Sequence, residues 1–299
     1  KPGPEAAAPP FLSIPAQISN TMQSMETVVS PVGTSQPVLD KGFVRLVDVM
    51  GDDVRIVQAA RVSYGEGTKT VREDAALIDY LMRHKHTSPF EMVEFTFHIK
   101  APIFVIRQWF RHRTASVNEI SARYSVMKDE FFLPSPADLR AQSKKNKQVG
   151  EGELPEDAAR AAHDRIAESQ RQAYAEYQGL LELGVARELA REVLPVGLYS
   201  EFYWKQNLHN LLHFLRLRLD WHAQAEIRAY ADAVAGFVKQ AVPLTWGSFE
   251  EHMLGGADLS RTELSVLRTM LDREQVTLAL QNAGFSKNRV QEAITKIFG

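Results

Sequence analysis

The chain has 299 residues, of which 44% are hydrophobic and 24% charged, a composition typical of globular proteins. A formal net charge of -2 excludes a global field that attracts nucleic acid, so an anion site requires a local concentration of arginine. The absence of cysteine excludes disulfides, cysteine zinc sites and thiolate nucleophiles. With no apolar run of membrane-spanning length and no recognisable targeting signal at the start, we expect a cytoplasmic protein that binds neither membrane nor nucleic acid.

Residues 1–40 are rich in Pro, Ala, Ser and Thr and show no hydrophobic periodicity. Seven prolines argue against any regular element there, so we expect a mobile arm, with ordered structure beginning near Gly42. The prolines are Pro2, Pro4, Pro9, Pro10, Pro15, Pro31 and Pro37.

Residues 43–50 predict a strand, and Asp53 is positioned to cap a helix that follows through residue 60. The glycine-containing segment 65–70 lacks the spacing of a phosphate loop and is interpreted as a surface loop. Residues 71–83 have the periodicity of an amphipathic helix. Strict alternation of apolar and polar residues over 93–100 predicts the clearest strand of the chain.

A polar loop lies between that helix and that strand. Pro89 forces a turn and holds Ser88 in extended geometry, and the loop also carries His86 and Glu91. Taken alone, such a loop is interpreted as structural.

The segment 111–124 contains three arginines, a histidine, a glutamate and two serines. Arginine presents a planar fork of donors that fits phosphate, so this density predicts a bound anion. The preceding residues predict a buried helix that delivers Arg111 to the site, followed by a loop from Asn118 to Ser121. The alternative is a solvated basic helix end, in which the arginines satisfy backbone carbonyls.

The second half is mainly helical. We expect an exposed loop over 141–156, helices over 156–183 and 186–193, a strand over 198–205 and a core helix over 223–242. Residues 257–299 form a small helical appendix, which opens with a capping box of Ser260 and Glu263.

The segment 207–224 places His209 and His213 on one helical face, a spacing compatible with zinc. Position 210 is Asn rather than Glu, and no third ligand lies at the usual distance, so no metal is expected. The alternative is a metal hydrolase built on this pair.

The sequence Arg111-His112-Arg113, seven residues, Ser121 resembles the signature of the flavin-dependent thymidylate synthases. The resemblance spans roughly residues 41–252 and leaves the arm and the appendix outside. The other matching stretches are Lys41-Gly42-Phe43-Val44, His86-Thr87-Ser88-Pro89-Phe90-Glu91, 97–109 and 207–224.

The resemblance implies an α+β fold, in which an antiparallel or mixed sheet is flanked by long helices, and a homotetramer with shared active sites. It also implies conversion of dUMP to dTMP, with methylenetetrahydrofolate as carbon donor and FAD, reduced by NADPH, as hydride donor. Without cysteine the chain cannot add a thiolate to C6 of uracil, so it must polarise the ring instead. Arg218 matches the family residue with that catalytic role.

The remaining roles are also implied by the resemblance. The dUMP-binding positions are Gln108, Arg111, Ser121, Ala122, Arg123, Arg191 and Arg218. The FAD-binding positions are Ser88, Arg111, His112, Arg113, Glu119, Asn207, His209 and His213. For two of these, other roles stay open, because Glu119 could orient an arginine and Asn207 could cap a helix. The alternative from a different class is a non-catalytic nucleotide- or RNA-binding protein, which would purify without the yellow colour of flavin.

Overall fold

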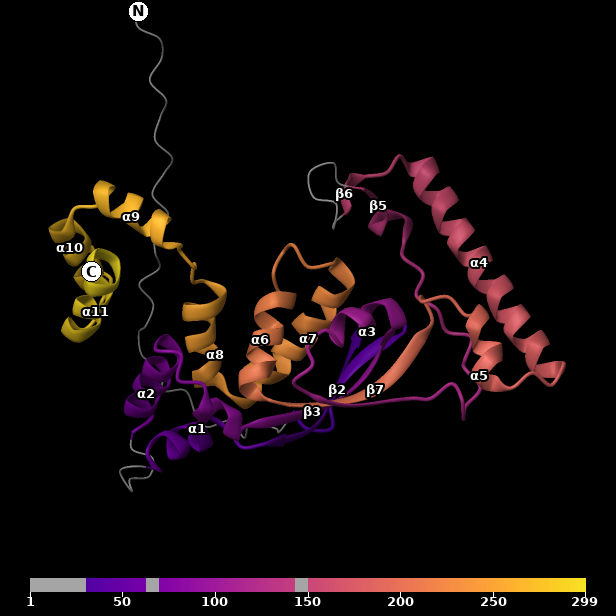
Figure 1. The fold of residues 1–299 in the computed structure, drawn as a ribbon, viewed down its shortest axis with the longest axis horizontal. Helices are drawn as coiled ribbons and strands as arrows, with labels where there is room; N and C mark the ends of the chain where they lie inside the picture. The colour runs from indigo at the N-terminus through magenta and orange to yellow at the C-terminus, as the bar shows by residue number, and fades with distance from the viewer. Residues whose placement is uncertain (1–30, 63–69, 143–149) are drawn as a thin grey trace, which may run out of the picture. The chain divides into compact units, whose positions relative to one another are not determined.

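The computed structural model describes residues 31–62, 70–142 and 150–299, and these contain a five-stranded antiparallel sheet of order β1-β2-β3-β7-β4 (Figure 1). The strands are β1 (Ser35–Val38), β2 (Gly42–Met50), β3 (Glu94–Pro102), β7 (Tyr199–Asn207) and β4 (Ser116–Glu119). In β3 the side chains of Phe95, Phe97 and Ile99 are fully buried, as the alternation of its sequence predicts. This sheet, combined with many helices, confirms the α+β class.

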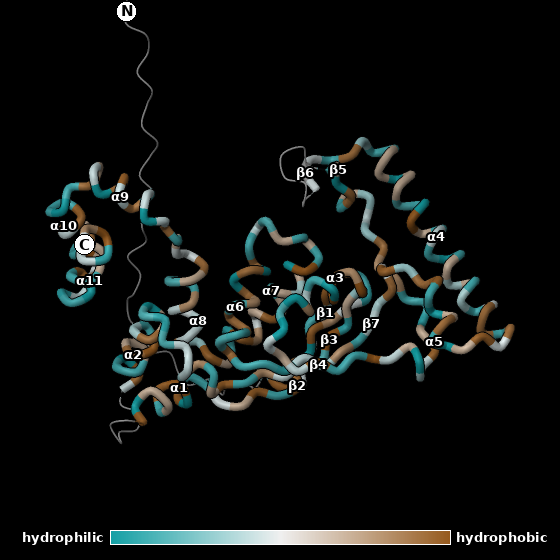
Figure 2. Tube along the Cα trace, viewed as in Figure 1, coloured by the Kyte–Doolittle hydropathy of each residue, from teal (hydrophilic) through white to brown (hydrophobic). Residues whose placement is uncertain are grey.

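Three helices pack on one face of the sheet: α3 (Ile103–Trp109), α6 (Leu208–Arg218) and α7 (Ala225–Ala241). Figure 2 shows hydrophobic residues along β3, in the middle of the sheet. The centre of the core is aromatic, with the Trp109 ring centroid 4.9 Å from Phe214 and 5.2 Å from Trp204. Such aromatic packing fixes the ends of α3 and α6 relative to each other.

A second group of helices comprises α1 (Asp53–Ala60), α2 (Val71–Arg83), α8 (Pro243–Phe249) and the π-helical turn η5 (Glu250–Leu254). The predicted cap of α1 is wrong by one residue, because Asp52 accepts from Arg55 N. Asp53 is instead buried, where it accepts from the backbone N–H groups of Leu244 and Thr245 at the start of α8. Burial raises the pKa of Asp53, while these hydrogen bonds oppose that rise.

The remaining elements of the body are η2 (Ser88–Met92), η3 (Pro136–Asp138), β5 (Arg140–Gln142), β6 (Gly150–Glu153), α4 (Glu156–Glu182), α5 (Arg187–Ala190) and η4 (Arg191–Val193). The predicted long helix is confirmed as α4. It forms a small core around Tyr177, whose hydroxyl accepts from Met127 N. The expected loop over 141–156 is partly a hairpin, since β5 and β6 pair, and residues 143–149 lie outside the described part.

The appendix consists of α9 (Arg261–Met270), α10 (Arg273–Asn282) and α11 (Lys287–Phe298). The capping box of Ser260 and Glu263 is present, as predicted. The appendix contacts the body through Asp79 of α2, which receives Arg289 of α11 at 3.4 Å as well as Arg83 at 2.6 Å. Ion pairs therefore attach α11 to α2.

Three expectations are wrong. Pro37 lies within a strand, because β1 is the edge of the sheet and pairs only with β2, so an edge position tolerates its missing N–H. Residues 116–119 form β4 rather than a loop, although all four are exposed. The helix α3 ends at Trp109, so Arg111 lies in the turn that follows. The glycine-containing segment predicted as a surface loop falls mostly on residues 63–69, outside the described part.

Among the described residues, no helix is long and apolar enough to cross a membrane.

Candidate functional site

Arg218, the last residue of α6, connects that helix to the turn after α3. Its Nε donates to Nε2 of His112 at 3.1 Å, and its Nη2 donates to the carbonyl oxygen of Gln108 at 3.1 Å. Because a guanidinium is only a donor, Nε2 of His112 must be the accepting nitrogen. His112 is therefore neutral and carries its proton on Nδ1.

The electrostatics agree with this assignment. Burial first, and then the positive charge of Arg218 and the neighbouring His213, together lower the pKa of His112 to about 4. Burial also lowers the pKa of Arg218, but arginine stays protonated. The arrangement thus holds a fixed, partly buried positive charge beside an uncharged imidazole.

A glutamine pair borders the same group. Gln108 Nε2 donates to Gln224 Oε1 at 2.5 Å, which joins α3 to the connection before α7. Gln224 lies within the stretch 207–224 but was not among the predicted site residues, since nothing in a single sequence shows that it faces Gln108.

A second group lies beyond the sheet edge formed by β4. A cavity of about 180 Å³ is lined by Glu119, Ala122 and Arg191, three predicted site residues, together with Ser200 of β7. Ser200 Oγ donates to Glu119 Oε1 at 2.7 Å, so Glu119 is held by a serine and not by an arginine. Arg191 donates through Nε to the carbonyl oxygen of Glu188.

Ser121 and Arg123 lie in a turn beside that cavity. The backbone N–H of Arg123 donates to Ser121 Oγ at 3.3 Å, and its guanidinium forms an ion pair with Glu188 at 3.3 Å. No base contacts the Ser121 hydroxyl within the part of the chain that the structure describes. Neither Glu188 nor Ser200 was among the predicted site residues. Glu188 lies 65 positions from Arg123 in the sequence, so nothing local connects the two.

Arg111 and Arg113 are both exposed, and neither makes an ion pair or side-chain hydrogen bond with any described residue. No hydrogen bond or ion pair among the described residues joins the Arg218 group to the Glu119 group. The single chain therefore brings the predicted residues together as two groups. Arg111 and Arg113 lie on the segment that connects the two groups, and their side chains have no partner in the described ranges.

Of the other predicted residues, only His213 lies beside one of these groups. Asn207 caps α6, where its Oδ1 accepts from Asn210 N at 3.0 Å, which is the structural role that its sequence position left open. Ser88 is exposed at the start of η2. His209 lines a different cavity, whereas the ring of His213 lies 5.9 Å from that of His112. No group of three metal-ligating side chains occurs in the described ranges.

Comparison with known proteins agrees with these motifs. The family model described as thymidylate synthase complementing protein matches residues 45–244. A flavin-dependent thymidylate synthase of Thermus thermophilus is 65% identical over 263 residues, which are 88% of this chain and 96% of that protein. The corresponding protein of Treponema denticola is 57% identical over 235 residues, 78% of this chain and 88% of that protein. The chain belongs to the flavin-dependent thymidylate synthases.

A solved structure shares the fold of this thymidylate synthase. The UMP/dUMP methylase PolB from Streptomyces cacaoi, bound with 5-Br dUMP, gives a TM-score of 0.67 at 35% identity, over 73% of this chain and 98% of that chain. The synthase converts dUMP to dTMP with FAD as its cofactor and with methylenetetrahydrofolate and NADPH as co-substrates. The activity implied by the sequence resemblance is thereby confirmed.

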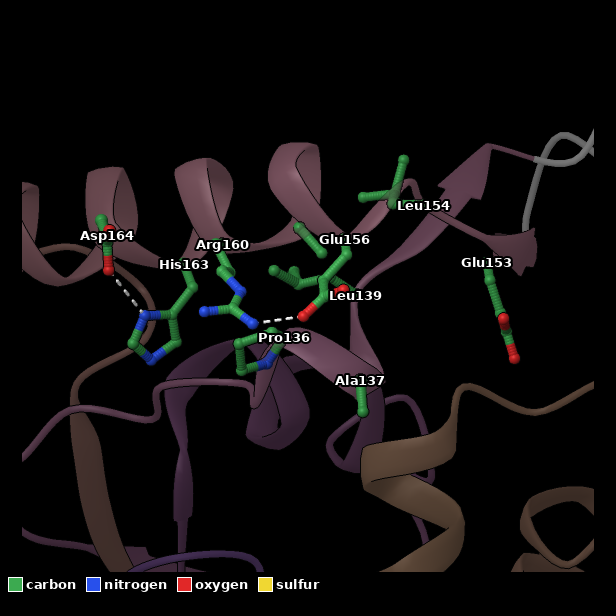
Figure 3. A pocket seen from close by; sticks show the side chains of 10 residues that line it. Pro136, Ala137, Leu139, Glu153, Leu154, Glu156, Arg160, His163 and Asp164 are labelled. Carbon is green, nitrogen blue, oxygen red and sulfur yellow. Dashed lines mark hydrogen bonds and ion pairs between the residues drawn. The ribbon is translucent and has the colours of Figure 1, made fainter.

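A wide hollow of about 740 Å³ lies elsewhere on the synthase, between α4 and the segment that contains η3 (Figure 3). Its charged side chains include two pairs, since Arg160 contacts Glu156 and His163 contacts Asp164. None of its lining residues belongs to the motifs of the synthase family.

Proposed function

We propose that in this synthase dUMP binds at Gln108, Arg111, Ser121, Ala122, Arg123, Arg191 and Arg218, and FAD at Ser88, Arg111, His112, Arg113, Glu119, Asn207, His209 and His213. The observation that carries the proposal is the pair of Arg218 and His112, because it holds a cation beside a neutral ring without neutralising it. A structural arginine would instead be expected to pair with a carboxylate.

The pair suits the activation of a pyrimidine without cysteine. A cation beside N3 and O2 of uracil stabilises the anionic form of the ring, in which C5 becomes nucleophilic. Arg218 supplies that charge, and its bonds to His112 and the Gln108 carbonyl hold its orientation before substrate arrives. Reduced FAD, when bound, supplies the hydride for the methyl group.

The exposed arginines fit the phosphates. Arg111 and Arg113 lack intramolecular carboxylate partners among the described residues, and Arg191 contacts only a backbone carbonyl there. Guanidinium groups without a carboxylate partner gain charge-assisted, bidentate hydrogen bonds when they bind a phosphate. The same observation supports FAD, because its pyrophosphate would gain the same kind of contact from these arginines.

We further propose a homotetramer in which each active site contains residues of several subunits. The cavity around Glu119 and Arg191 has only about 180 Å³, below the roughly 300 Å³ at which ligand pockets usually begin. The Arg218 group is separate from it, and many proposed ligands of dUMP and FAD are exposed. A second copy of the chain would complete both the cavity and the Arg218 group. We place the reaction in the cytoplasm, where dUMP and NADPH are used.

Mixing two impaired variants tests this arrangement. Arg218→Ala and Arg191→Ala are purified separately, dissociated, mixed in equal amounts and reassembled. If one subunit supplies Arg218 and another Arg191, about a quarter of the sites regain both residues under random mixing. The mixture is then expected to form dTMP faster than either variant alone. Recovery no greater than that of the separate variants would show that both residues act within one chain.

The flavin assignment has its own measurement. The purified protein should show the absorbance of bound FAD, and the Arg113→Ala variant should retain less of it at equal protein concentration. Lys287→Gln, an exposed charge change far along the chain in α11, is the matched control and should keep full flavin content. Full flavin content in Arg113→Ala would remove Arg113 from the proposed site.

A further inference from the structure

A cavity of about 390 Å³ lies at the junction of the appendix and the body. The body contributes the end of α2, the loop before η2 and one face of α6. The region after α8 contributes residues of η5 and 256–258, and α11 contributes Lys296. The cavity thus contains residues from outside the matched family region, 45–244.

The lining combines an apolar wall with a cationic rim. The apolar residues are Leu81, Met82, Phe90, Leu212 and Met253, of which the first four are buried. The polar residues are Arg83, Lys85, His86, Thr87, His209, Arg216, Glu251, His252, Asp258 and Lys296. Four of these are permanent cations and two are carboxylates, so the site favours an anion attached to an apolar group.

Most of these charges are already paired. Arg83 contacts Asp79 and Glu292, Arg216 contacts Asp258, and Glu251 contacts Arg289. Lys85 and Lys296 remain, and neither forms an ion pair or a hydrogen bond through its side chain with the described residues. Both ammonium groups act on the same carboxylate, since Arg216 first, and then Lys85 and Lys296, lower the pKa of Asp258. Both lysines therefore lie close enough to Asp258 for their charges to affect it, although only Arg216 contacts it.

The backbone of Lys85 is a second, independent observation. Its φ is 58°, in the left-handed region where glycine is favoured, just past the end of α2. A non-glycine residue in this conformation is strained, and such strain occurs preferentially at ligand sites. Glycine would complete the same turn without that strain.

We propose that Lys85 of the body and Lys296 of the appendix together bind the anionic end of a reactant whose flat, apolar part lies in this cavity. The inference rests on the proposed function, because two reactants of the synthase have this chemistry. Methylenetetrahydrofolate carries carboxylates on its glutamate, and NADPH carries a 2′-phosphate. The cavity adjoins the proposed flavin region through His209, where either molecule must approach.

Binding to the FAD-loaded enzyme with dUMP present tests the proposal. The variants are Lys85→Gly, Lys296→Gln and the control Lys287→Gln, which changes an exposed lysine of the same helix α11 outside the cavity. Two ligand pairs identify the anion: tetrahydrofolate against tetrahydropteroate, which lacks the glutamate, and NADP⁺ against NAD⁺. Loss of one charge-assisted contact is expected to weaken the recognised ligand about tenfold.

The expected result is a tenfold loss for one of the two ligands in both cavity variants. Its counterpart that lacks the glutamate or the 2′-phosphate, and Lys287→Gln, should be unaffected. The pair that responds identifies the source of the anion. Lys85→Gly should also raise the melting temperature, because it relieves the left-handed strain. Unchanged affinity for both tetrahydrofolate and NADP⁺ would overturn the proposal, as would an equal loss in Lys287→Gln. Retained FAD content and dUMP affinity in these variants would show that the proposed function itself still holds.

Discussion

Arg218 makes its contacts with a neutral imidazole and a carbonyl, so its full charge is available to a ligand. Arg218→Ala should lower single-turnover dTMP formation at saturating dUMP about ten- to a hundred-fold, since one charge-assisted contact is worth about 1.5–3 kcal/mol in the transition state. Arg218→Lys should rescue little, because it lacks the planar fork that reaches His112 and the Gln108 carbonyl together. Near-normal rates in the Ala variant would refute this role.

The depressed pKa of His112 makes stability depend on pH. The pKa of His112 is about 4 in the folded chain and 6.5 in the unfolded chain, so between these two pH values the unfolded state binds one more proton. His112 therefore contributes stability that is fully present above pH 6.5 and is lost as pH falls toward 4. Urea unfolding at pH 7 and pH 5 should show this loss, reduced in His112→Gln. The His112 ring should titrate near 4 by NMR, and higher in Arg218→Ala; an unshifted ring pKa would contradict the assignment.

Ser121 invites a nucleophile interpretation in a chain without cysteine, but its surroundings oppose it. Its oxygen accepts from the Arg123 N–H, and Glu119, the nearest carboxylate in sequence, is bonded to Ser200. A serine without a base is not activated. Ser121→Ala should weaken dUMP binding and slow turnover while leaving measurable dTMP synthesis in a single-turnover assay with reduced flavin. A flavin-loaded variant with no product above background, or a dUMP adduct on Ser121, would restore the nucleophile.

At the scale of elements, the start of β2 is packed against α7 without space for a side chain. A Cβ at Gly42 would lie 1.9 Å from the Tyr230 hydroxyl, which donates to the Lys100 carbonyl. Gly42→Ala should lower the free energy of unfolding by about 3 kcal/mol or more, with partial recovery when combined with Tyr230→Phe. Gly179→Ala in α4 is the control, because open space surrounds it, and should be neutral or stabilising. Equal effects of both substitutions would contradict the packing argument.

The elements also show what a sequence encodes locally. The helix α4, the strand β3 and the Ser260 cap follow from periodicity and side-chain type within a few residues. The strand β4 was missed because its four residues are exposed and owe their conformation to pairing with β7. The contacts of Gln108 with Gln224 and of Glu119 with Ser200 join residues 116 and 81 positions apart. Only the folded sheet brings these residues together. The sequence of one chain contains even less information about which subunits complete the site.

At the scale of the whole molecule, the position of β1 limits how many N-terminal residues can be deleted without loss of stability. Deletion of residues 1–30 should leave flavin content and turnover within a factor of a few. Deletion of 1–40 also removes β1 and Asp40, which accepts from the Tyr199 hydroxyl at 2.6 Å, and should lower the melting temperature by several degrees. Thermal unfolding of both truncated proteins, followed by flavin absorbance, measures the difference. Equal melting temperatures would show that β1 adds nothing to the fold.

The two outer strands of the sheet, β1 and β4, have four residues each. Pro37 interrupts the row of outward donors on one, and Glu119 ends the other with a charge. Short, interrupted borders offer a poor template for strand addition by a neighbouring chain, the route by which sheets grow into insoluble fibrils. Association of this enzyme through its sheet edges is therefore disfavoured, which leaves the broad surfaces of its helices for contacts between subunits.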